Sequence, residues 1–460
     1  MKHYDVIWIG TGQATGTIVP RLVQAGKTVA IAEGGRFGGS CVNYGCTPTK
    51  TMVASARVAH MARRGPDFGV NTGEVSIDFA RVMERQNTMR HGTSHGMERW
   101  LHGMDNVDIY PAFATFVDAH TVQVGDQQIS ADTIVINAGA RPDKPAVPGI
   151  DSVDWLDNAR LLDLKELPGH LMIIGGSYIA LEFAQIFRRL GSQVTVLQRG
   201  SQLMPREDAD IAAQVNEILE SEGINIHLNA SVQRVAQPAP QQIDVFFQQD
   251  GAARQVQGSH LLLAVGRTPN SDRLNLAAAG VAVDRRGYIQ VDDVMRTTTP
   301  HIFAVGDING EGAFTHTAVN DGEIFWDFYS GEDDRALSQR IPTYALFVDP
   351  PLGRVGMSEK EARASGRNVL IATRAMKHIA RAKEKDETAG MVKILVDADS
   401  EQFLGAAILG VGGDEVVNMF TPFMVTGQSY KLFRKAVLTH PTVAELMPWI
   451  LDDLKPLEGA

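Results

Sequence analysis

The sequence of 460 residues is poor in cysteine and has no long apolar segment. Its only cysteines, Cys41 and Cys46, can form neither a disulfide framework nor a four-cysteine zinc site. No run of about 18 apolar residues is present, which excludes a helix that spans a bilayer. The apolar run at 6–9 leads at once into a glycine-rich turn, so we expect a strand there and no secretory signal. The predicted location is the cytoplasm.

Positive charge is also scarce relative to negative charge. There are 43 basic and 54 acidic side chains, for a formal net charge of −11. Such a chain is a poor candidate for binding nucleic acid or an anionic membrane surface. The composition, 44% hydrophobic and 21% charged, is that of an ordinary globular protein, and the length predicts about two to four domains.

The first sign of function is a strand, turn, helix and strand pattern near the N-terminus. An apolar run at 4–9 leads into the turn 10–16, a helical pattern follows, and a second apolar run ends at Glu33. In a dinucleotide site the glycines allow a tight turn and close approach of a pyrophosphate, which the N–H groups of the helix N-terminus then bind. A carboxylate about 20 positions later accepts a ribose hydroxyl, the role predicted for Glu33.

The same pattern recurs once. An apolar run at 171–174 leads into the turn 175–180, and the next strand ends at Gln198. Both units span 23 positions from the first glycine to the end of the second strand. Thr15 replaces the third glycine of the first turn, and Ser177 replaces the second glycine of the other. One unit alone could be a plain strand, turn and helix, but two equal units predict two dinucleotide sites.

Later segments extend both units. The strand-like segment 133–142 resembles 260–269, since each ends in a Gly-Arg or Gly-x-Arg pattern before proline, and 302–307 is a third variant. From residue 338 onward, a group of apolar strands is followed by helical patterns, which predicts an α+β domain with an antiparallel sheet.

Both cysteines lie in the segment 38–50, between the first unit and a helical pattern that runs to Met61. Pro48 suits the first turn of that helix, which places Cys46 at its N-terminus. The helix dipole stabilises a thiolate there and makes it reactive, and Cys41 lies within reach for a disulfide. The alternative is a pair of buried structural thiols.

With these motifs, the chain resembles the flavin-dependent pyridine nucleotide–disulfide oxidoreductases, which include glutathione reductase, dihydrolipoamide dehydrogenase and mercuric reductase. The resemblance covers essentially the whole chain, and it is carried by the segments 10–16, 41–46, 175–182, 264–270, 303–307 and 440–445. It implies an α/β fold with two Rossmann-like dinucleotide-binding domains and a C-terminal α+β dimerisation domain. The predicted parts are 1–148 and 266–337 for FAD, 149–265 for NAD(P)H and 338–460 for dimerisation.

The resemblance also implies the cofactor sites. FAD would bind the first unit, with its ribose on Glu33 and its ribityl chain near Asp307, and NAD(P)H would bind the second. No resident metal site is predicted. The residues expected to contact the two cofactors are Gly10, Gly12, Thr15, Glu33, Gly39, Ser40, Lys50, Ala114, Gly139, Gly175, Ser177, Tyr178, Ile179, Gln198, Arg199, Arg206, Gly266, Arg267 and Asp307.

The catalytic groups follow from the same resemblance. Cys46 would be the thiol on the flavin side of a redox disulfide, and Cys41 the thiol that attacks the substrate. Lys50 would pair with Glu182 beside the flavin, and Tyr178 would cover the nicotinamide pocket. The acid–base would be His440, oriented by Glu445 and contributed by the partner subunit, so a homodimer is expected. Without this context, a Lys–Glu pair is more often a surface pair, and a lone histidine near the C-terminus is usually an ordinary exposed or core histidine.

The substrate is less specified. The chain has no cysteine near its C-terminus, so the relays of resistance-type mercuric reductases and of high-molecular-weight thioredoxin reductases are missing. Pro20 and Arg21 fit poorly with the arginine that glutathione reductases carry in the first helix, and Gln198 stands where dihydrolipoamide dehydrogenases usually have an acidic residue. The segments 314–321 and 404–419 look more like mercuric-reductase-like proteins and a bacterial copper(II)-active flavoprotein of reactive-chlorine resistance.

We therefore predict a reductase that passes hydride from NADPH to FAD, then to the Cys41–Cys46 disulfide, and finally to a disulfide or a thiophilic metal ion. NADPH is favoured over NADH because Gln198 is neutral and Arg199 and Arg206 follow it. The alternatives are an NAD-dependent dihydrolipoamide dehydrogenase and a non-catalytic, FAD-bound, redox-responsive binding protein. A role for His316 beside the flavin or substrate is left open.

Overall fold

The fold is described from a computed structural model that covers residues 1–332 and 334–458. Its first sheet has seven strands in the order β3-β2-β1-β6-β5-β4, with β17 also paired to β6. The strands are β1 (Lys2–Ile9), β2 (Val29–Ala32), β3 (Val107–Tyr110), β4 (Ala114–Phe116), β5 (Thr121–Val124), β6 (Gln127–Ile136) and β17 (Ile302–Ala304). The predicted first unit is therefore confirmed as β1, a turn, α1 (Thr15–Gln24) and β2, with β1 and β2 parallel.

The second sheet has five parallel strands in the order β11-β10-β9-β15-β8. The strands are β8 (Trp155–Leu156), β9 (His170–Ile174), β10 (Gln193–Leu197), β11 (Asn225–His227) and β15 (His260–Leu263). Its helices are α5 (Asn158–Leu161), α6 (Tyr178–Leu190) and α7 (Ala209–Ser221), and an antiparallel ribbon is formed by β12 (Ala230–Ala239), β13 (Gln242–Gln249) and β14 (Ala252–Gly258). The unit β9-α6-β10 repeats the unit β1-α1-β2, as the equal spacing predicts.

The C-terminal part is an antiparallel sheet in the order β18-β19-β22-β21-β20-β23. Its strands are β18 (Thr343–Leu346), β19 (Leu352–Gly356), β20 (Val369–Ala375), β21 (Met391–Asp397), β22 (Phe403–Leu409) and β23 (Lys455–Pro456). Short helices surround it: α9 (Glu359–Ala364), α10 (Ala380–Glu384), α11 (Gly413–Val416), α12 (Thr421–Val425), α13 (Tyr430–Arg434) and α14 (Met447–Ile450). Every residue of β21 and β22 is buried, because the helices cover this sheet.

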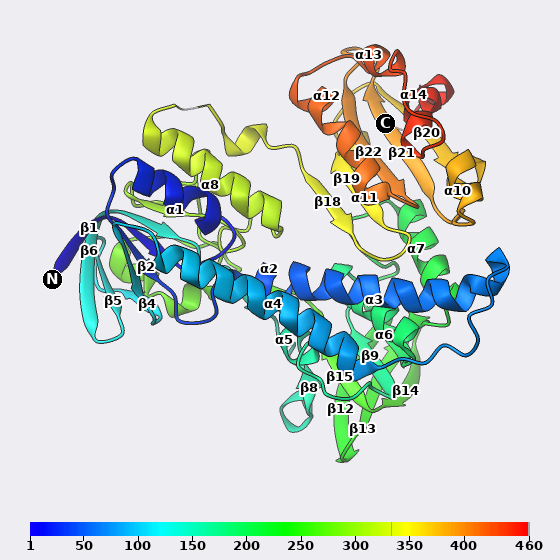
Figure 1. The fold of residues 1–460 in the computed structure, drawn as a ribbon, viewed down its shortest axis with the longest axis horizontal. Helices are drawn as coiled ribbons and strands as arrows, with labels where there is room; N and C mark the ends of the chain where they lie inside the picture. The colour runs from blue at the N-terminus through cyan, green and yellow to red at the C-terminus, as the bar shows by residue number, and fades with distance from the viewer. Residues whose placement is uncertain (333, 459–460) are drawn as a thin grey trace.

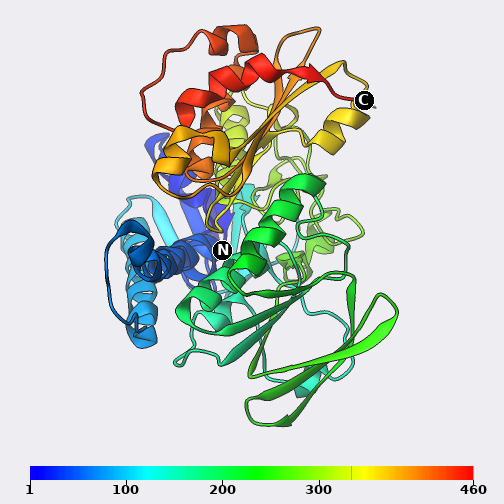
Figure 2. The ribbon, with the colours of Figure 1, turned by 90° about the vertical axis from the view of Figure 1, so that its right-hand side faces the viewer.

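The three sheets meet around two long helices. After α2 (Gly39–Tyr44), α3 (Cys46–Arg64) and α4 (Phe79–His102) run across the middle of the molecule in Figure 1, and α8 (Thr315–Ser330) lies near α1. Figure 2 shows the C-terminal sheet at one end and the ribbon β12–β14 at the other. The turn that follows β1, the first residues of α6 and the start of α3 line one cavity in this central region. None of the helices described is long and apolar enough to cross a membrane.

A small ladder joins the first two sheets. The segments that follow the two similar strands, β7 (Ala140–Pro142) and β16 (Arg267–Pro269), pair with each other antiparallel, with Thr268 opposite Arg141. The resemblance between 133–142 and 260–269 thus has a structural counterpart that the sequence did not predict.

Candidate active site

The first glycine turn is shaped by Asn137, which follows β6. A Cβ atom on Gly10, whose φ is +92°, would lie 2.5 Å from the Asn137 carbonyl oxygen, and one on Gly12 would lie 2.6 Å from its side-chain oxygen. Both positions therefore require glycine. Thr15 is buried behind the turn, and its Oγ1 accepts hydrogen bonds from Trp8 Nε1 at 2.9 Å and Asn137 Nδ2 at 3.1 Å. Those two bonds explain why threonine fits at the third glycine position.

Glu33 follows β2 and lies beside this turn. Its Oε2 accepts hydrogen bonds from the Thr11 backbone N–H at 2.9 Å and the Thr11 hydroxyl at 2.7 Å, and its Oε1 accepts one from Gly35 N at 2.7 Å. A carboxylate has about four acceptor sites, so this fixed carboxylate can still accept a further hydroxyl donor.

The second turn is equally constrained. Gly175 has a φ of +120°, and a Cβ there would lie 2.2 Å from the Ala264 carbonyl oxygen. A Cβ on Gly176 would lie 2.9 Å from the Gln198 side chain, whose Nε2 donates to Gln202 O at 3.1 Å. Ser177 is the N-cap residue of α6, but its side chain makes no capping hydrogen bond.

Two arginines lie close to this second turn. Arg199 and Arg206 are exposed, and neither has an ion-pair partner within residues 1–332 and 334–458. Both guanidinium groups are therefore available to an anionic ligand.

The two cysteines lie at consecutive helix starts. Cys41 is in the short helix α2, and Cys46 is the first residue of α3, as the position of Pro48 predicts. Both are free thiols in this structure, and Cys46 opens to the cavity. The Thr315 Oγ1, at the start of α8, lies 3.5 Å from Cys46 Sγ.

The two thiols differ in acidity. The hydrogen bond from Cys41, together with the Thr315 hydroxyl and the positive charge of Lys50, lowers the pKa of Cys46 to about 6. The same bond to Cys46, together with burial, raises the pKa of Cys41 above its usual range. Reduction therefore yields a thiolate at Cys46 and a neutral thiol at Cys41.

Lys50 lies one helical turn after Cys46. Its Nζ donates to the two carboxylate oxygens of Glu182 at 2.8 and 3.0 Å, which links α3 to α6. Glu182 is 7% exposed and also accepts a hydrogen bond from Phe347 N at 3.0 Å. The Lys50 ammonium lies 4.6 Å from the centre of the Phe347 ring. A largely buried, charge-assisted pair of this kind holds its geometry better than the surface pair considered as the alternative.

One cavity of about 850 Å³ connects these elements. Fifteen of the predicted residues line it: Gly10, Gly12, Glu33, Gly39, Ser40, Cys41, Cys46, Lys50, Ala114, Gly139, Tyr178, Ile179, Glu182, Arg267 and Asp307. The other predicted residues do not: Thr15, Gly175, Ser177, Gln198, Arg199, Arg206, Gly266, His440 and Glu445. The cavity thus joins the first turn to the thiols and to the start of α6, while the arginines lie outside it.

Arg267 and Asp307 also line the cavity. The Arg267 Nε lies 3.4 Å from an Asp307 carboxylate oxygen but makes no hydrogen bond, and its Nη2 donates to Ser40 Oγ at 3.3 Å. Burial raises the pKa of Asp307, although the positive charge of Arg267 opposes that rise. These groups leave hydrogen-bonding capacity for a polar ligand in the cavity.

His440 does not line the cavity that holds the thiols of its own chain. Its side chain is 75% exposed, and Nδ1 donates to the Glu445 carboxylate at 3.0 Å. Glu445 thus fixes the tautomer and leaves Nε2 free to exchange a proton. The predicted pair is present, and it faces outward.

Other lining residues were missed from the sequence. Thr315 reaches Cys46, whereas the neighbouring His316, which was singled out, has Nε2 2.6 Å from the Thr343 carbonyl oxygen. Phe347 and Tyr344 enter the cavity from the C-terminal part of the chain. The Phe-Thr-His-Thr motif at the start of α8 marked this region, but no local pattern shows which of its side chains points inward.

Two dinucleotide-type turns, a dithiol at a helix N-terminus and one shared cavity define a two-cofactor redox protein. Comparison with known proteins gives the particular family: the chain belongs to the pyridine nucleotide-disulphide oxidoreductases. The family model matches residues 4–322, and the model of the dimerisation domain of the same family matches residues 342–451. The family depends on FAD and a pyridine nucleotide, and the dimerisation domain supports a homodimer.

Individual relatives match over nearly the full chain. The probable pyridine nucleotide-disulfide oxidoreductase RclA of Escherichia coli is 36% identical over 97% of this chain and 98% of its own length. A mercuric reductase of Bacillus cereus is 31% identical over 96% of this chain and 70% of its own, and a dihydrolipoyl dehydrogenase of Vibrio cholerae is 31% identical over 96% and 93%. A solved structure of RclA, described as a Cu(II) complex of an HOCl-induced flavoprotein disulfide reductase, has a TM-score of 0.88 and covers 98% of this chain and 99% of that one.

Proposed function

We propose that this protein is an NADPH-dependent flavoprotein reductase that delivers electrons through Cys41 and Cys46 to a small disulfide or a thiophilic metal ion. The observation that carries the proposal is the pair of thiols, Cys41 in α2 and Cys46 at the start of α3, in one cavity with the first dinucleotide turn and the first residues of α6. A binding protein needs neither a polarised thiol pair nor the Lys50–Glu182 pair beside it.

The residues of the cavity fit FAD. Gly10 and Gly12 leave the backbone bare where a pyrophosphate must approach, and Glu33 presents a fixed carboxylate for a ribose. Asp307 follows β17 and lines the same cavity from the carboxyl edge of the first sheet. When bound, FAD supplies the means to accept a hydride from a nicotinamide and to pass two electrons to a disulfide. In this proposal Lys50, held by Glu182, keeps a positive charge beside the Cys46 thiolate.

The acidity of the two thiols sets their roles. Cys46 is ionised near neutral pH, so in the proposal it stays on the cofactor side. Cys41 keeps its proton and needs a base to become a nucleophile, which we assign to His440 of the partner subunit. The exposed imidazole, with Nε2 free, suits transfer across a dimer interface.

The proposed chemistry balances for both substrate classes. With a disulfide, the Cys41 thiolate attacks one sulfur, and the leaving thiolate takes the proton from the partner's His440. The Cys46 thiolate then attacks Cys41, releases the second thiolate, which takes a proton from solvent, and restores the Cys41–Cys46 disulfide. With copper(II), the two thiols lose two electrons and two protons, two copper(II) ions become copper(I), and the same disulfide forms. NADPH and one proton then regenerate the dithiol.

The preference for NADPH rests on the end of β10. A carboxylate there would repel a 2′-phosphate, but Gln198 is neutral and its amide is already bonded to the backbone of the following loop. The exposed Arg199 and Arg206 supply the positive charge that a phosphate requires. We expect kcat/KM for NADPH to exceed that for NADH, and the double variant Arg199→Ala/Arg206→Ala to lower the ratio. A wild-type ratio at or below unity contradicts the assignment.

Support for the metal ion as a substrate comes from the relatives. One is described as a complex with Cu(II), and others are mercuric reductases. The experiment is NADPH oxidation by purified protein under anaerobic conditions with copper(II), mercury(II), oxidised glutathione, lipoamide and thioredoxin, using wild type and His440→Ala. Disulfide exchange uses His440 twice, as the base for Cys41 and as the acid for the leaving thiolate, whereas metal reduction has no leaving thiolate to protonate. A metal reductase is therefore expected to lose less of its rate in the variant than a disulfide reductase. No turnover with any oxidant would sink the proposal.

A further inference from the structure

The C-terminal sheet sends Tyr344 into the cavity that holds the thiols. Tyr344 lies on β18, and its hydroxyl donates to Glu207, in the loop between β10 and α7. Burial and the nearby carboxylate raise the pKa of Tyr344, so its hydroxyl keeps the proton that it donates. The ring is thus fixed at one end by a charge-assisted hydrogen bond.

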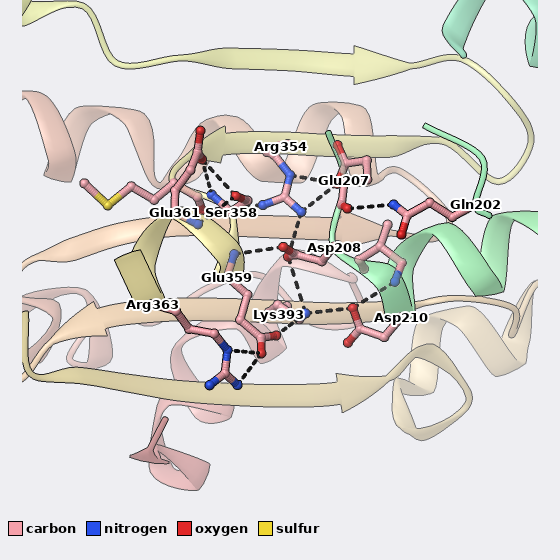
Figure 3. A network of polar contacts seen from close by, with 12 residues as sticks. Gln202, Glu207, Asp208, Asp210, Arg354, Ser358, Glu359, Glu361, Arg363 and Lys393 are labelled. Carbon is pink, nitrogen blue, oxygen red and sulfur yellow. Dashed lines mark hydrogen bonds and ion pairs between the residues drawn. The ribbon is translucent and has the colours of Figure 1, made fainter. Parts of the chain in front are cut away.

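Glu207 is itself held firmly. Its Oε2 accepts from Arg354 Nε at 2.9 Å and Nη2 at 2.6 Å, and the same Nη2 donates to Asp208 at 2.9 Å. Lys393 binds Asp208 at 3.3 Å and also Asp210 and Glu359, each at 2.7 Å, as Figure 3 shows. The Glu207, Asp208, Arg354 and Lys393 side chains are at most 3% exposed, so solvent hardly screens these pairs. This network joins the loop that carries Arg206 to strands β19 and β21.

The other side of Tyr344 is an aromatic cluster. Its ring is stacked on Phe314 with a centroid distance of 5.6 Å and an interplanar angle of 9°. Tyr178, the first residue of α6, meets the Tyr344 ring edge-on at 5.5 Å and 67°, and it meets Phe314 at 6.2 Å. Tyr178 is thus packed against two rings, one of which is anchored through Glu207.

The following inference rests on the proposed function and on the role that the family resemblance implies for Tyr178, which is to cover the nicotinamide pocket. We propose that Tyr344 is a positioning residue that holds Tyr178 in its closed position. A nicotinamide reaches the cavity only when the Tyr178 ring leaves these contacts, so the contacts oppose binding. The apparent affinity for the nucleotide is therefore the intrinsic affinity multiplied by the fraction of protein in which the ring has left these contacts, and that fraction is small. Removing the Tyr344 ring raises that fraction and tightens binding.

The test is the equilibrium dissociation constant of NADP⁺ for the FAD-loaded dimer, measured by the change in flavin absorbance without turnover. An edge-to-face aromatic contact predicts that Tyr344→Ala tightens NADP⁺ binding about 2- to 10-fold. Tyr344→Phe keeps the ring, so its dissociation constant stays within about twofold of wild type. If Tyr344→Ala does not fold, Tyr344→Leu serves instead, because it also lacks the aromatic edge.

A double-mutant cycle shows whether the effect passes through Tyr178. In a Tyr178→Ala background, Tyr344→Ala changes the dissociation constant no further. Arg363→Ala, which removes an outer partner of Glu359, is the control and leaves the constant unchanged. The inference is overturned if Tyr344→Ala binds NADP⁺ more weakly than the wild type or equally well. It is also overturned if Tyr344→Ala tightens NADP⁺ binding by the same factor in the Tyr178→Ala background. If the wild type binds neither NADP⁺ nor NAD⁺, the proposed function fails, and the inference fails with it.

Discussion

The acidity of Cys46 gives the sharpest prediction about the thiol pair. The largest cause of its lowered pKa is the hydrogen bond that the Cys41 thiol donates to it, ahead of the Thr315 hydroxyl and Lys50. A hydrogen bond to an ionised group contributes roughly 1.5–3 kcal/mol. Since one pKa unit equals about 1.4 kcal/mol, Cys41→Ala is expected to raise the pKa of Cys46 by about 1 to 2. Cys41→Ser keeps a donor at the same place, so the pKa is expected to stay near its value in the wild type.

The assay is a pH titration of the long-wavelength thiolate-to-flavin band. In both Cys41 variants, Cys46 is a lone thiol beside oxidised flavin, so the band is present without added reductant. Two-electron reduction produces it in the wild type, and Cys46→Ser abolishes it. Because the pKa of Cys46 is lowered, the thiolate exists above about pH 6 and is lost as the pH falls through that value. In Cys41→Ala, the pH at the midpoint of this titration is expected to be higher than in the wild type.

Two results would refute this reasoning. Equal midpoints in Cys41→Ala and Cys41→Ser would show that the hydrogen bond does not set the acidity of Cys46. A band that survives Cys46→Ser would exchange the roles of the two thiols.

Four further predictions concern other parts of the molecule. His440→Ala slows disulfide reduction by roughly 10²–10⁴-fold, and stopped flow shows flavin reduction by NADPH nearly unchanged, because only the sulfur step needs this proton. Mixed dimers of Cys41→Ser and His440→Ala chains regain about a quarter of wild-type activity if each site uses the partner's histidine; no recovery places the histidine in the same chain. Arg354→Met leaves Glu207 and Asp208 buried without their main cation and lowers the free energy of unfolding by about 3–5 kcal/mol in urea, whereas the exposed Arg363→Ala changes it by less than about 0.5 kcal/mol. Glu33→Ala weakens FAD binding, measured by flavin release on dilution, and Glu33→Asp weakens it less. If both variants retain FAD equally well, Glu33 is not part of the FAD site.

The fold was largely predictable because its local signals repeat. The turns at Gly10 and Gly175 require backbone conformations that glycine adopts without strain, and the strands before them are buried on both faces, so the sequence pattern reveals both units. The ladder between β7 and β16 was not predictable, because pairing of two three-residue segments depends on how the sheets are placed. The domain boundaries and the individual site roles stay predictions.

The site was predictable where neighbours in sequence are neighbours in space. The position of Cys46 at a helix start follows from Pro48. His440 and its partner Glu445 are only five positions apart in the sequence. Thr315, Phe347 and Tyr344 reach the cavity from distant segments, and nothing in their local sequence encodes that approach. The Glu207–Arg354 pair joins residues 147 positions apart, and it could not be predicted from the sequence for the same reason.

The central claim is that electrons from NADPH reach the Cys41–Cys46 pair, and a count of free thiols tests it most directly. The air-oxidised protein is mixed anaerobically with one equivalent of NADPH per chain, quenched with an alkylating reagent and analysed by mass spectrometry. The account predicts no alkylated cysteine before NADPH and two per chain afterwards, at Cys41 and Cys46. Bleaching of the flavin while both cysteines stay in a disulfide would contradict it.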